Sequence, residues 1–105
     1  MEQPNLSYIN SLSGGDKDFK QKLIDIIKKE YPEEKDIYLT NIKKGNYKQA
    51  ASNVHKLKHK ISILGLEKSY DIAANYEANL LEDNTDLKQE FEAILNVMTN
   101  YLQQL

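Results

Sequence analysis

Apolar residues recur three and four positions apart along almost the whole chain, and this periodicity constrains the fold more than any other feature. Residues at this spacing lie on one face of a helix. No segment alternates apolar and polar residues as a half-buried strand does. The pattern is interrupted only at glycines, at prolines and at the polar stretch 82–85. The sequence therefore predicts an all-α protein.

The first two predicted helices lie before Gly45. A short one covers residues 6–12 and ends at the glycine pair 14–15. Asp16 follows, and its carboxylate is suited to cap the start of a second, much longer segment. Pro32 lies inside that segment, where it removes a backbone donor and crowds the preceding turn. We expect either one long helix kinked at Pro32 or two abutting helices.

The third predicted helix starts at Asn46 and carries the two histidines of the chain. Asn46 and Gln49 match the pattern of a capping box. Gly65 is suited to the left-handed position that follows a helix, and Leu66 can then pack back on Ile61. Two further amphipathic segments, one on each side of residues 82–85, complete the chain.

The predicted core consists of the apolar stripes of the four longer segments. Four amphipathic helices with short connections favour an antiparallel four-helix bundle, here with a short N-terminal helix. A chain of 105 residues supports a single core. We expect one domain over residues 1–105, divided into an N-terminal segment (1–15) and the bundle (16–105). The stripes comprise Phe19, Leu23, Ile26, Ile27, Tyr31, Tyr38, Leu39, Ile42, Tyr47, Ala50, Ala51, Val54, Leu57, Ile61, Leu64, Tyr70, Ala73, Ala74, Leu80, Leu81, Leu87, Phe91, Ile94, Met98, Tyr101 and Leu105.

Composition narrows the class of protein. No apolar run approaches the roughly 20 residues that span a bilayer. The polar N-terminus lacks the basic and apolar regions of a signal peptide. Because the chain has no cysteine, disulfides and thiolate chemistry are excluded. We expect a cytoplasmic, monomeric protein that does not bind a membrane.

Charge is distributed unevenly along the chain. Residues 43–68 contain seven lysines and one acid, whereas the rest contains seven lysines and fifteen acids. A positive patch on an acidic body favours a local anionic partner over a generic polyanion, although solvation of a helix face accounts for any single lysine. The absence of arginine and the net charge of -2 argue against a nucleic-acid binder, for which salt-dependent duplex binding would be the test.

Both histidines lie inside this basic region. On a helical wheel at about 100° per residue centred on Val54, the apolar stripe covers roughly -80° to +60°. His55 falls at about 100° and His59 at about 140°, so His55 borders the buried edge and His59 is more exposed, with nothing predicted to hold it. Lys58 lies at the rim near His55, where its stem packs while its ammonium reaches solvent.

Three interpretations of the histidines remain open on this evidence. His55 can be a rim residue that only packs. His55 and His59, one turn apart, can ligate one metal ion, although no third ligand is evident nearby and the lysines repel cations. A neutral imidazole is also a nucleophile for phosphoryl groups. Adjacent lysines favour its neutral form and attract the phosphoryl oxygens.

The sequence around His55 resembles the signature of histidine-containing phosphotransfer (HPt) domains. His55 is followed three residues on by Lys58 and ten residues on by Gly65. The family pattern is His-x-x-Lys-Gly with a second glycine six residues later, on the second main helix of a four-helix bundle. The chain departs from it at His59, which replaces the glycine after the lysine. Similar stretches elsewhere are Asn5-Leu6-Ser7-Tyr8-Ile9, Gly14-Gly15-Asp16 with Phe19, and Tyr76-Glu77 with Leu80.

The resemblance implies a phosphocarrier of a two-component multistep phosphorelay. His55 would accept a phosphoryl group from the aspartate of a receiver domain and pass it to another receiver, and Lys58 would stabilise it. The family has no autonomous kinase activity and no cofactor or metal of its own, because the receiver supplies Mg²⁺. The chain agrees in having no Gly-rich phosphate loop and no carboxylate cluster around the histidine. The implied receiver-docking surface comprises Ser52, Lys56, His59, Ser62 and Gly65.

The implied partners are receiver domains of response regulators and hybrid histidine kinases. The chain either stands alone, which the initial methionine and the helix predicted to run to Leu105 favour, or is part of a hybrid kinase. The alternative from another class is a non-catalytic helical adaptor that binds signalling partners and uses His55 at most as a contact.

Overall fold

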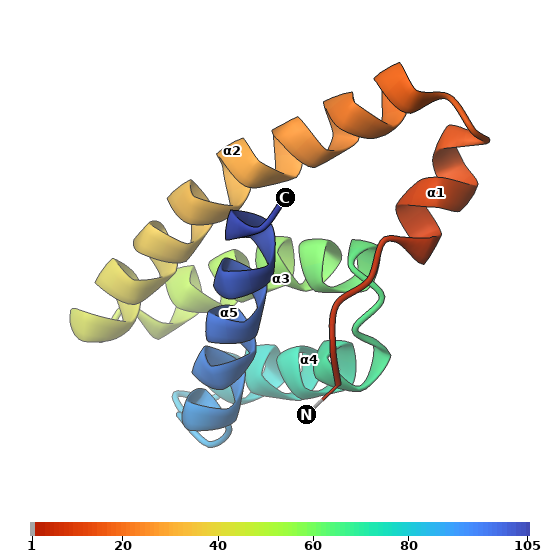
Figure 1. Ribbon diagram of the computed structural model, residues 1–105. Helices are drawn as coiled ribbons and strands as arrows, with labels where there is room; N and C mark the ends of the chain where they lie inside the picture. Colours follow the sequence, from red (N-terminus) through yellow and green to blue (C-terminus); the bar gives the residue numbers. More distant parts are fainter. Residues whose placement is uncertain (1) are drawn as a thin grey trace.

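A computed structural model describes residues 2–105 as five helices (Figure 1). Met1, the first residue of the predicted N-terminal segment, lies outside the described residues. No strand occurs within residues 2–105, so the all-α class is confirmed. The helices are α1 (Ser7–Ser13), α2 (Lys17–Lys43), α3 (Tyr47–Ile63), α4 (Glu67–Leu81) and α5 (Lys88–Gln103).

Helix α3 lies at the centre of the fold. It packs against both α2 and α4, which Figure 1 shows above and below it. Short connections reverse the chain between α2 and α3 and again between α3 and α4. Helix α5 contacts α4 and α2 and runs across the other helices in Figure 1. The compact helical packing agrees with the sequence analysis, whereas the regular antiparallel four-helix bundle stays a prediction.

Helix α2 is a single helix of 27 residues, although Pro32 lies inside it. Pro32 has no N–H to donate to the carbonyl of Lys28 one turn earlier, yet the helix continues on both sides. The start of α2 is capped as predicted. Asp16 Oδ1 accepts hydrogen bonds from the backbone N–H groups of Asp18 at 3.0 Å and Phe19 at 3.1 Å. Of the two expectations for this segment, the single helix is the one observed.

Part of the predicted core is exposed. Three predictions of burial in α2 are wrong, because Phe19, Ile26 and Leu39 are exposed. Ile24, which was not predicted to be buried, is buried. At about 100° per residue, the buried residues of α2 lie in one sector around the helix. Phe19 and Ile26 fall on one side of this sector and Leu39 falls on the other, so the predicted apolar face was too wide. The predictions for Leu81 and Leu105 are also wrong, because both residues are exposed.

The apolar stripe of α3 is buried as predicted. Val54, Leu57 and Ile61 have no exposed surface. Asn53, which the stripe did not include, is also buried, and its Oδ1 accepts a hydrogen bond from Asn41 Nδ2 of α2 at 2.7 Å. The predicted capping box is wrong. The side chain of Asn46 makes no cap hydrogen bond, since its ψ of 70° falls short of the extended backbone usual at an N-cap.

Gly65 ends α3 in the left-handed conformation that the sequence predicted, with φ of +78°. The N–H of Leu66 donates to the carbonyl of Ile61 at 3.2 Å, and Leu66 is buried, as this type of helix end favours. A Cβ at position 65 would lie 2.6 Å from Asn5 Nδ2. Asn5 is held there because its N–H donates to the carbonyl of Leu64 at 2.8 Å. The turn therefore needs glycine both for its backbone and for its contact with the N-terminal segment.

Aromatic side chains from three helices pack together in the core. Tyr38 of α2 lies edge-on to Tyr76 of α4 and Phe91 of α5, with ring centroids 6.2 and 5.2 Å apart. Tyr38 donates to Glu92 at 3.0 Å, so Tyr76 donates to the Tyr38 oxygen at 2.7 Å. Burial raises the pKa of Tyr76 to about 12 and also raises the pKa of Tyr38. Both hydroxyls therefore remain neutral donors.

Glu2 attaches the N-terminal segment to the start of α4. Its carboxylate accepts hydrogen bonds from the N–H groups of Ser69 at 2.7 Å and Lys68 at 3.1 Å. The first turn of a helix has N–H groups without a partner inside the helix, and the N-cap residue Leu66 has no side chain that caps them. Partial burial opposes ionisation of Glu2, but these hydrogen bonds outweigh it and lower its pKa.

Leu57→Ala is expected to lower the free energy of unfolding by about 2–5 kcal/mol, because it removes a buried side chain and leaves a cavity. Chemical denaturation followed by circular dichroism measures the change. Leu81→Ala is the matched control, since Leu81 is 52% exposed; it is expected to change the free energy by less than about 0.5 kcal/mol. Equal effects of the two substitutions would contradict the observed burial.

Glu2→Gln is expected to destabilise the fold near neutral pH and to lose this effect in acid. The folded pKa of Glu2 lies below its ordinary value of 4.5. Its stabilising contribution is therefore complete above that value and disappears as the pH falls through the folded pKa. Denaturation midpoints of wild type and variant should differ at neutral pH and converge as the pH falls through the folded pKa of Glu2. Glu82→Gln, at an exposed carboxylate, is the control. A difference in midpoint between wild type and Glu2→Gln that persisted in acid would exclude a role for the charge of Glu2 in capping α4.

Candidate functional site

His55 lies on the edge of α3 that faces α4. Its side chain is 52% exposed, whereas Val54 and Leu57 beside it are fully buried. His59, one turn further along α3, is exposed. The half-exposed position of His55 beside the buried stripe agrees with the helical wheel. It leaves an imidazole at the border of the core, with one side packed and the other open to solvent.

Glu77 of α4 joins His55 to Lys58. Its Oε2 lies 3.0 Å from His55 Nδ1, and its Oε1 lies 3.0 Å from Lys58 Nζ. The sequence analysis did not place Glu77 in the site, and it expected no carboxylate cluster around the histidine; the structure brings this one carboxylate into direct contact. A signal was present, because the Tyr76-Glu77 pair belonged to the HPt resemblance. Helical spacing could not reveal the contact, since 22 residues separate His55 and Glu77.

The buried face of α4 positions Glu77. Ala73, Tyr76 and Leu80 have no exposed surface and direct that face towards the core. Glu77 follows Tyr76 by about 100° around the helix axis, so it lies at the border of the buried face. Since α3 and α4 pack side by side, this border of α4 meets the edge of α3 that carries His55.

The contact with Glu77 determines where His55 carries its proton. An ionised carboxylate only accepts hydrogen bonds, so Nδ1 must be the protonated nitrogen that donates to it. In a neutral imidazole, Nε2 then keeps an unshared electron pair. Nε2 has no hydrogen-bond partner among residues 2–105. The site thus presents a nucleophilic nitrogen on a half-exposed ring whose opposite nitrogen is held by a carboxylate.

Lys58 is more enclosed than the sequence analysis predicted. Its side chain is 13% exposed and does not extend freely into solvent. The ammonium lies 5.5 Å from the centre of the Tyr70 ring, within the range of cation–π attraction, and it forms the ion pair with Glu77. These two contacts from α4 hold a positive charge close to His55.

His59 contacts His55 directly. The ring centroids are 4.9 Å apart and the planes meet at 70°, an edge-to-face arrangement. The sequence analysis expected nothing to hold His59, and the structure corrects this. On its other side, His59 borders a hollow of about 430 Å³ that Glu30, Glu33 and Glu34 of α2 also line.

The remaining residues of the implied docking surface are divided between separate regions. Ser52 and Lys56 line a hollow of about 310 Å³ together with His55. Ser62 lines a different hollow of about 260 Å³. Gly65 lies in the turn after α3, against the N-terminal segment. The structure therefore brings Ser52 and Lys56 together with His55, and it places Ser62 and Gly65 apart from that group.

Ion pairs neutralise part of the basic region. Lys60 Nζ lies 2.8 Å from Glu34 Oε2 and 3.2 Å from Glu30 Oε1. Burial opposes the charged form of Lys60, but the two carboxylates outweigh it and raise its pKa. Lys58 is likewise paired with Glu77. The positive field around His55 is thus weaker than the seven lysines of residues 43–68 suggest.

Within the part of the chain that the structure describes, no three His, Cys, Asp or Glu side chains are placed to hold a metal ion. No helix in residues 2–105 combines the length and the apolar character needed to cross a membrane. Comparisons of the chain with family models, curated proteins and solved structures give no match. The resemblance to HPt domains therefore stays a prediction that rests on the residues quoted for it.

Glu77→Ala is expected to change the tautomer of His55. In the neutral imidazole of the wild type, studied in alkaline buffer, His55 should carry its proton on Nδ1. Without the carboxylate, the proton should be shared between the two nitrogens. Long-range nitrogen–proton correlation spectra distinguish the two forms, and His59 serves as the internal reference. An unchanged His55 pattern in the variant would show that Glu77 does not determine the tautomer.

Proposed function

We propose that this chain is a histidine phosphocarrier, an HPt-like domain that relays phosphoryl groups between receiver domains. The observation that carries the proposal is the group formed by His55, Glu77 and Lys58. In it, a half-exposed imidazole donates from one nitrogen to a carboxylate, keeps the other nitrogen free, and has a fixed ammonium next to it. A nucleophile, a group that orients it and a cation suffice for phosphoryl transfer, which depends mainly on positioning and electrostatic stabilisation.

In the proposed step, His55 takes the phosphoryl group from an aspartyl phosphate. The electron pair on Nε2 forms a bond to phosphorus, and the bond from phosphorus to the aspartate oxygen breaks, so that the aspartate leaves as a carboxylate. The imidazole then carries the phosphoryl group on Nε2 and a proton on Nδ1, and its ring is positively charged. The carboxylate of Glu77, 3.0 Å from Nδ1, stabilises that charge. The reverse step delivers the group to the aspartate of a second receiver.

Lys58 acts on the phosphoryl oxygens in this proposal. An ammonium has three protons to donate. Lys58 Nζ forms an ion pair with Glu77 Oε1 at 3.0 Å, but this oxygen has no hydrogen-bond partner among the described residues. The protons of Lys58 therefore remain for an anionic group on His55. Because the cation is already held by Glu77 and Tyr70, little rearrangement is required when the charge arrives.

The proposal also covers the arrangement of the helices and the receiver domain that binds the chain. Helices α2 to α5 would correspond to the antiparallel four-helix bundle of the family, with α1 as the additional N-terminal helix. The receiver would approach over Ser52, Lys56 and His59 and would bring the Mg²⁺ that its own aspartate requires. Leu81, which lines the same hollow as His55 and is 52% exposed, adds an apolar surface to this approach.

His55→Gln is expected to abolish phosphorylation of the chain by phosphorylated receiver domains, whereas His59→Gly should preserve it. The two residues lie one turn apart on α3 among the same lysines, but only His55 has the carboxylate that fixes its proton. The assay is incubation of each protein with a panel of phosphorylated receivers, followed by detection of acid-labile, base-stable phosphate on the chain.

Phosphate on the His55→Gln protein, or phosphate mapped to His59 in the wild type, would contradict this assignment. If the wild type bound receivers but never acquired phosphate, the chain would be a helical adaptor. His55→Gln and His59→Gly form a matched pair, since both substitutions lie on exposed positions of one helix. A loss of phosphorylation in His55→Gln alone would therefore reflect the loss of the phosphoryl acceptor and not a general folding defect.

A further inference from the structure

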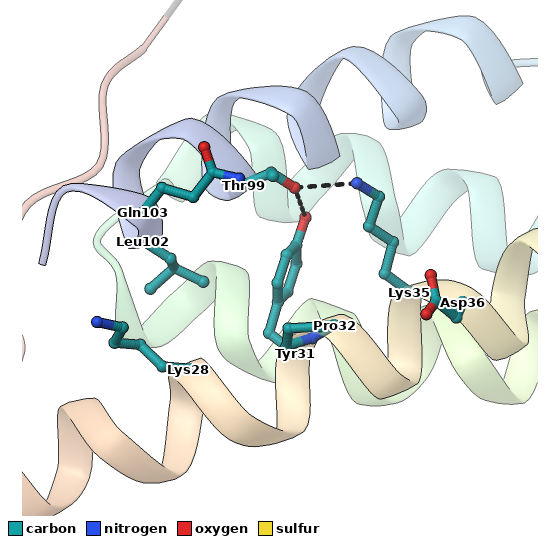
Figure 2. Close-up of a pocket in the computed structure, with 8 residues that line it drawn as sticks. All are labelled: Lys28, Tyr31, Pro32, Lys35, Asp36, Thr99, Leu102 and Gln103. Atoms are coloured by element: carbon teal, nitrogen blue, oxygen red, sulfur yellow. Dashed lines mark hydrogen bonds between the residues drawn. The ribbon is translucent and has the colours of Figure 1, made fainter.

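A second pocket lies between α2 and α5, apart from the residues that surround His55 (Figure 2). Its volume is about 240 Å³. Tyr31 and Pro32 of α2 form one wall and Leu102 of α5 another, while Lys35 and Thr99 lie at one end. None of these residues takes part in the site proposed for phosphoryl transfer.

A directed series of hydrogen bonds runs along this pocket. The hydroxyl of Tyr31 donates its single proton to the carbonyl of Leu95 at 2.7 Å. Tyr31 therefore accepts from the hydroxyl of Thr99 at 3.0 Å, and Thr99 accepts from Lys35 Nζ at 3.1 Å. Burial raises the pKa of Tyr31 to about 12, so its hydroxyl stays protonated. Each hydroxyl in this series donates its proton towards the protein interior. Only the ammonium of Lys35 has further protons that it can donate to another group.

Lys35 has no carboxylate partner. The ion pairs among residues 2–105 involve other side chains, although Asp36 is its neighbour in the sequence. In Figure 2, Asp36 lies beyond Lys35 on the side away from Leu102. The ammonium is therefore held in a defined position by Thr99 and is not neutralised, which is the arrangement that an anionic ligand requires.

Between Lys35 at one end and Lys28 and Gln103 at the other, the pocket is suited to an apolar group. The proline ring, the face of Tyr31 and the side chain of Leu102 present mainly carbon. The volume is below the roughly 300–1,000 Å³ of pockets that hold drug-sized ligands. Asp36 at the edge disfavours a second negative charge. A ligand that fits these limits is small and singly charged, with a short apolar body.

We propose that this pocket binds a small monocarboxylate, with its carboxylate on the Lys35 ammonium and its apolar body between Pro32 and Leu102. The ligand class follows from the Lys35 ammonium, which Thr99 fixes and no carboxylate neutralises, at the end of an apolar pocket of limited size. Lys28, which also lines the pocket, adds positive charge that favours an anion. Binding at this site does not depend on the phosphocarrier proposal, because the two sites share no residue.

Titration of the isotope-labelled full-length chain with benzoate, followed by nuclear magnetic resonance, tests the proposal. Benzoate is expected to cause saturable shifts of the signals of Thr99 and Leu102. Benzyl alcohol, which lacks the charge, should bind at least about tenfold more weakly, since a hydrogen bond to a charged group contributes about this factor. Acetate should also bind at least about tenfold more weakly, because it lacks the apolar area that the ring buries.

Lys35→Met is expected to weaken benzoate binding by about tenfold. Lys29→Met is the matched control, because Lys29 is exposed on the same helix and lies outside the pocket; it should leave binding unchanged. Circular dichroism confirms that both variants fold. The proposal is overturned if benzoate causes no saturable shift at Thr99 and Leu102, if acetate or benzyl alcohol binds as well as benzoate, or if folded Lys35→Met retains full affinity.

Discussion

The burial of one face of α3 between α2 and α4 is the interaction on which the rest of the structure depends. Val54, Leu57 and Ile61 are completely covered, and each such side chain contributes about 1.5–3 kcal/mol when it leaves water. Because α3 contacts both neighbours, its packing sets their separation. Side chains on the two edges of α3 are thereby brought opposite fixed positions on α2 and α4.

The lysines on the two edges of α3 have different partners. Lys60 faces α2 and is paired with two carboxylates, so its charge is satisfied within the fold. Lys58 faces α4 and shares the single carboxylate of Glu77 with His55. Both lysines are equally covered, at 13% exposure. Only the α4 edge therefore combines a cation with protons to spare and an imidazole with a free nitrogen.

Two series of hydrogen-bonded hydroxyl groups link the helices. One series ends at a hydrogen-bond acceptor, and the other starts from a donor. Tyr76 and Tyr38 lead to the carboxylate of Glu92, which accepts the last proton and closes the series inside the protein. Thr99 and Tyr31 lead away from the ammonium of Lys35, whose further donors face a pocket. Buried hydroxyls need such partners because an unpaired polar group in the core is costly. Only the second series therefore leaves donors that face a pocket, and the ligand proposal depends on this difference.

Local patterns predicted local structure well. The cap at Asp16 and the left-handed glycine at position 65 were predicted because each depends on residues within a few positions. The exposure of Phe19 was not predicted, since helical periodicity does not determine how much of an apolar face the neighbouring helices cover. By itself, then, the sequence determined the helices, the buried face of α3 and the rim position of His55, all of which follow from helical periodicity. Only the tertiary structure decided which apolar faces are covered and that Glu77 holds His55, because both depend on packing between helices distant in the chain.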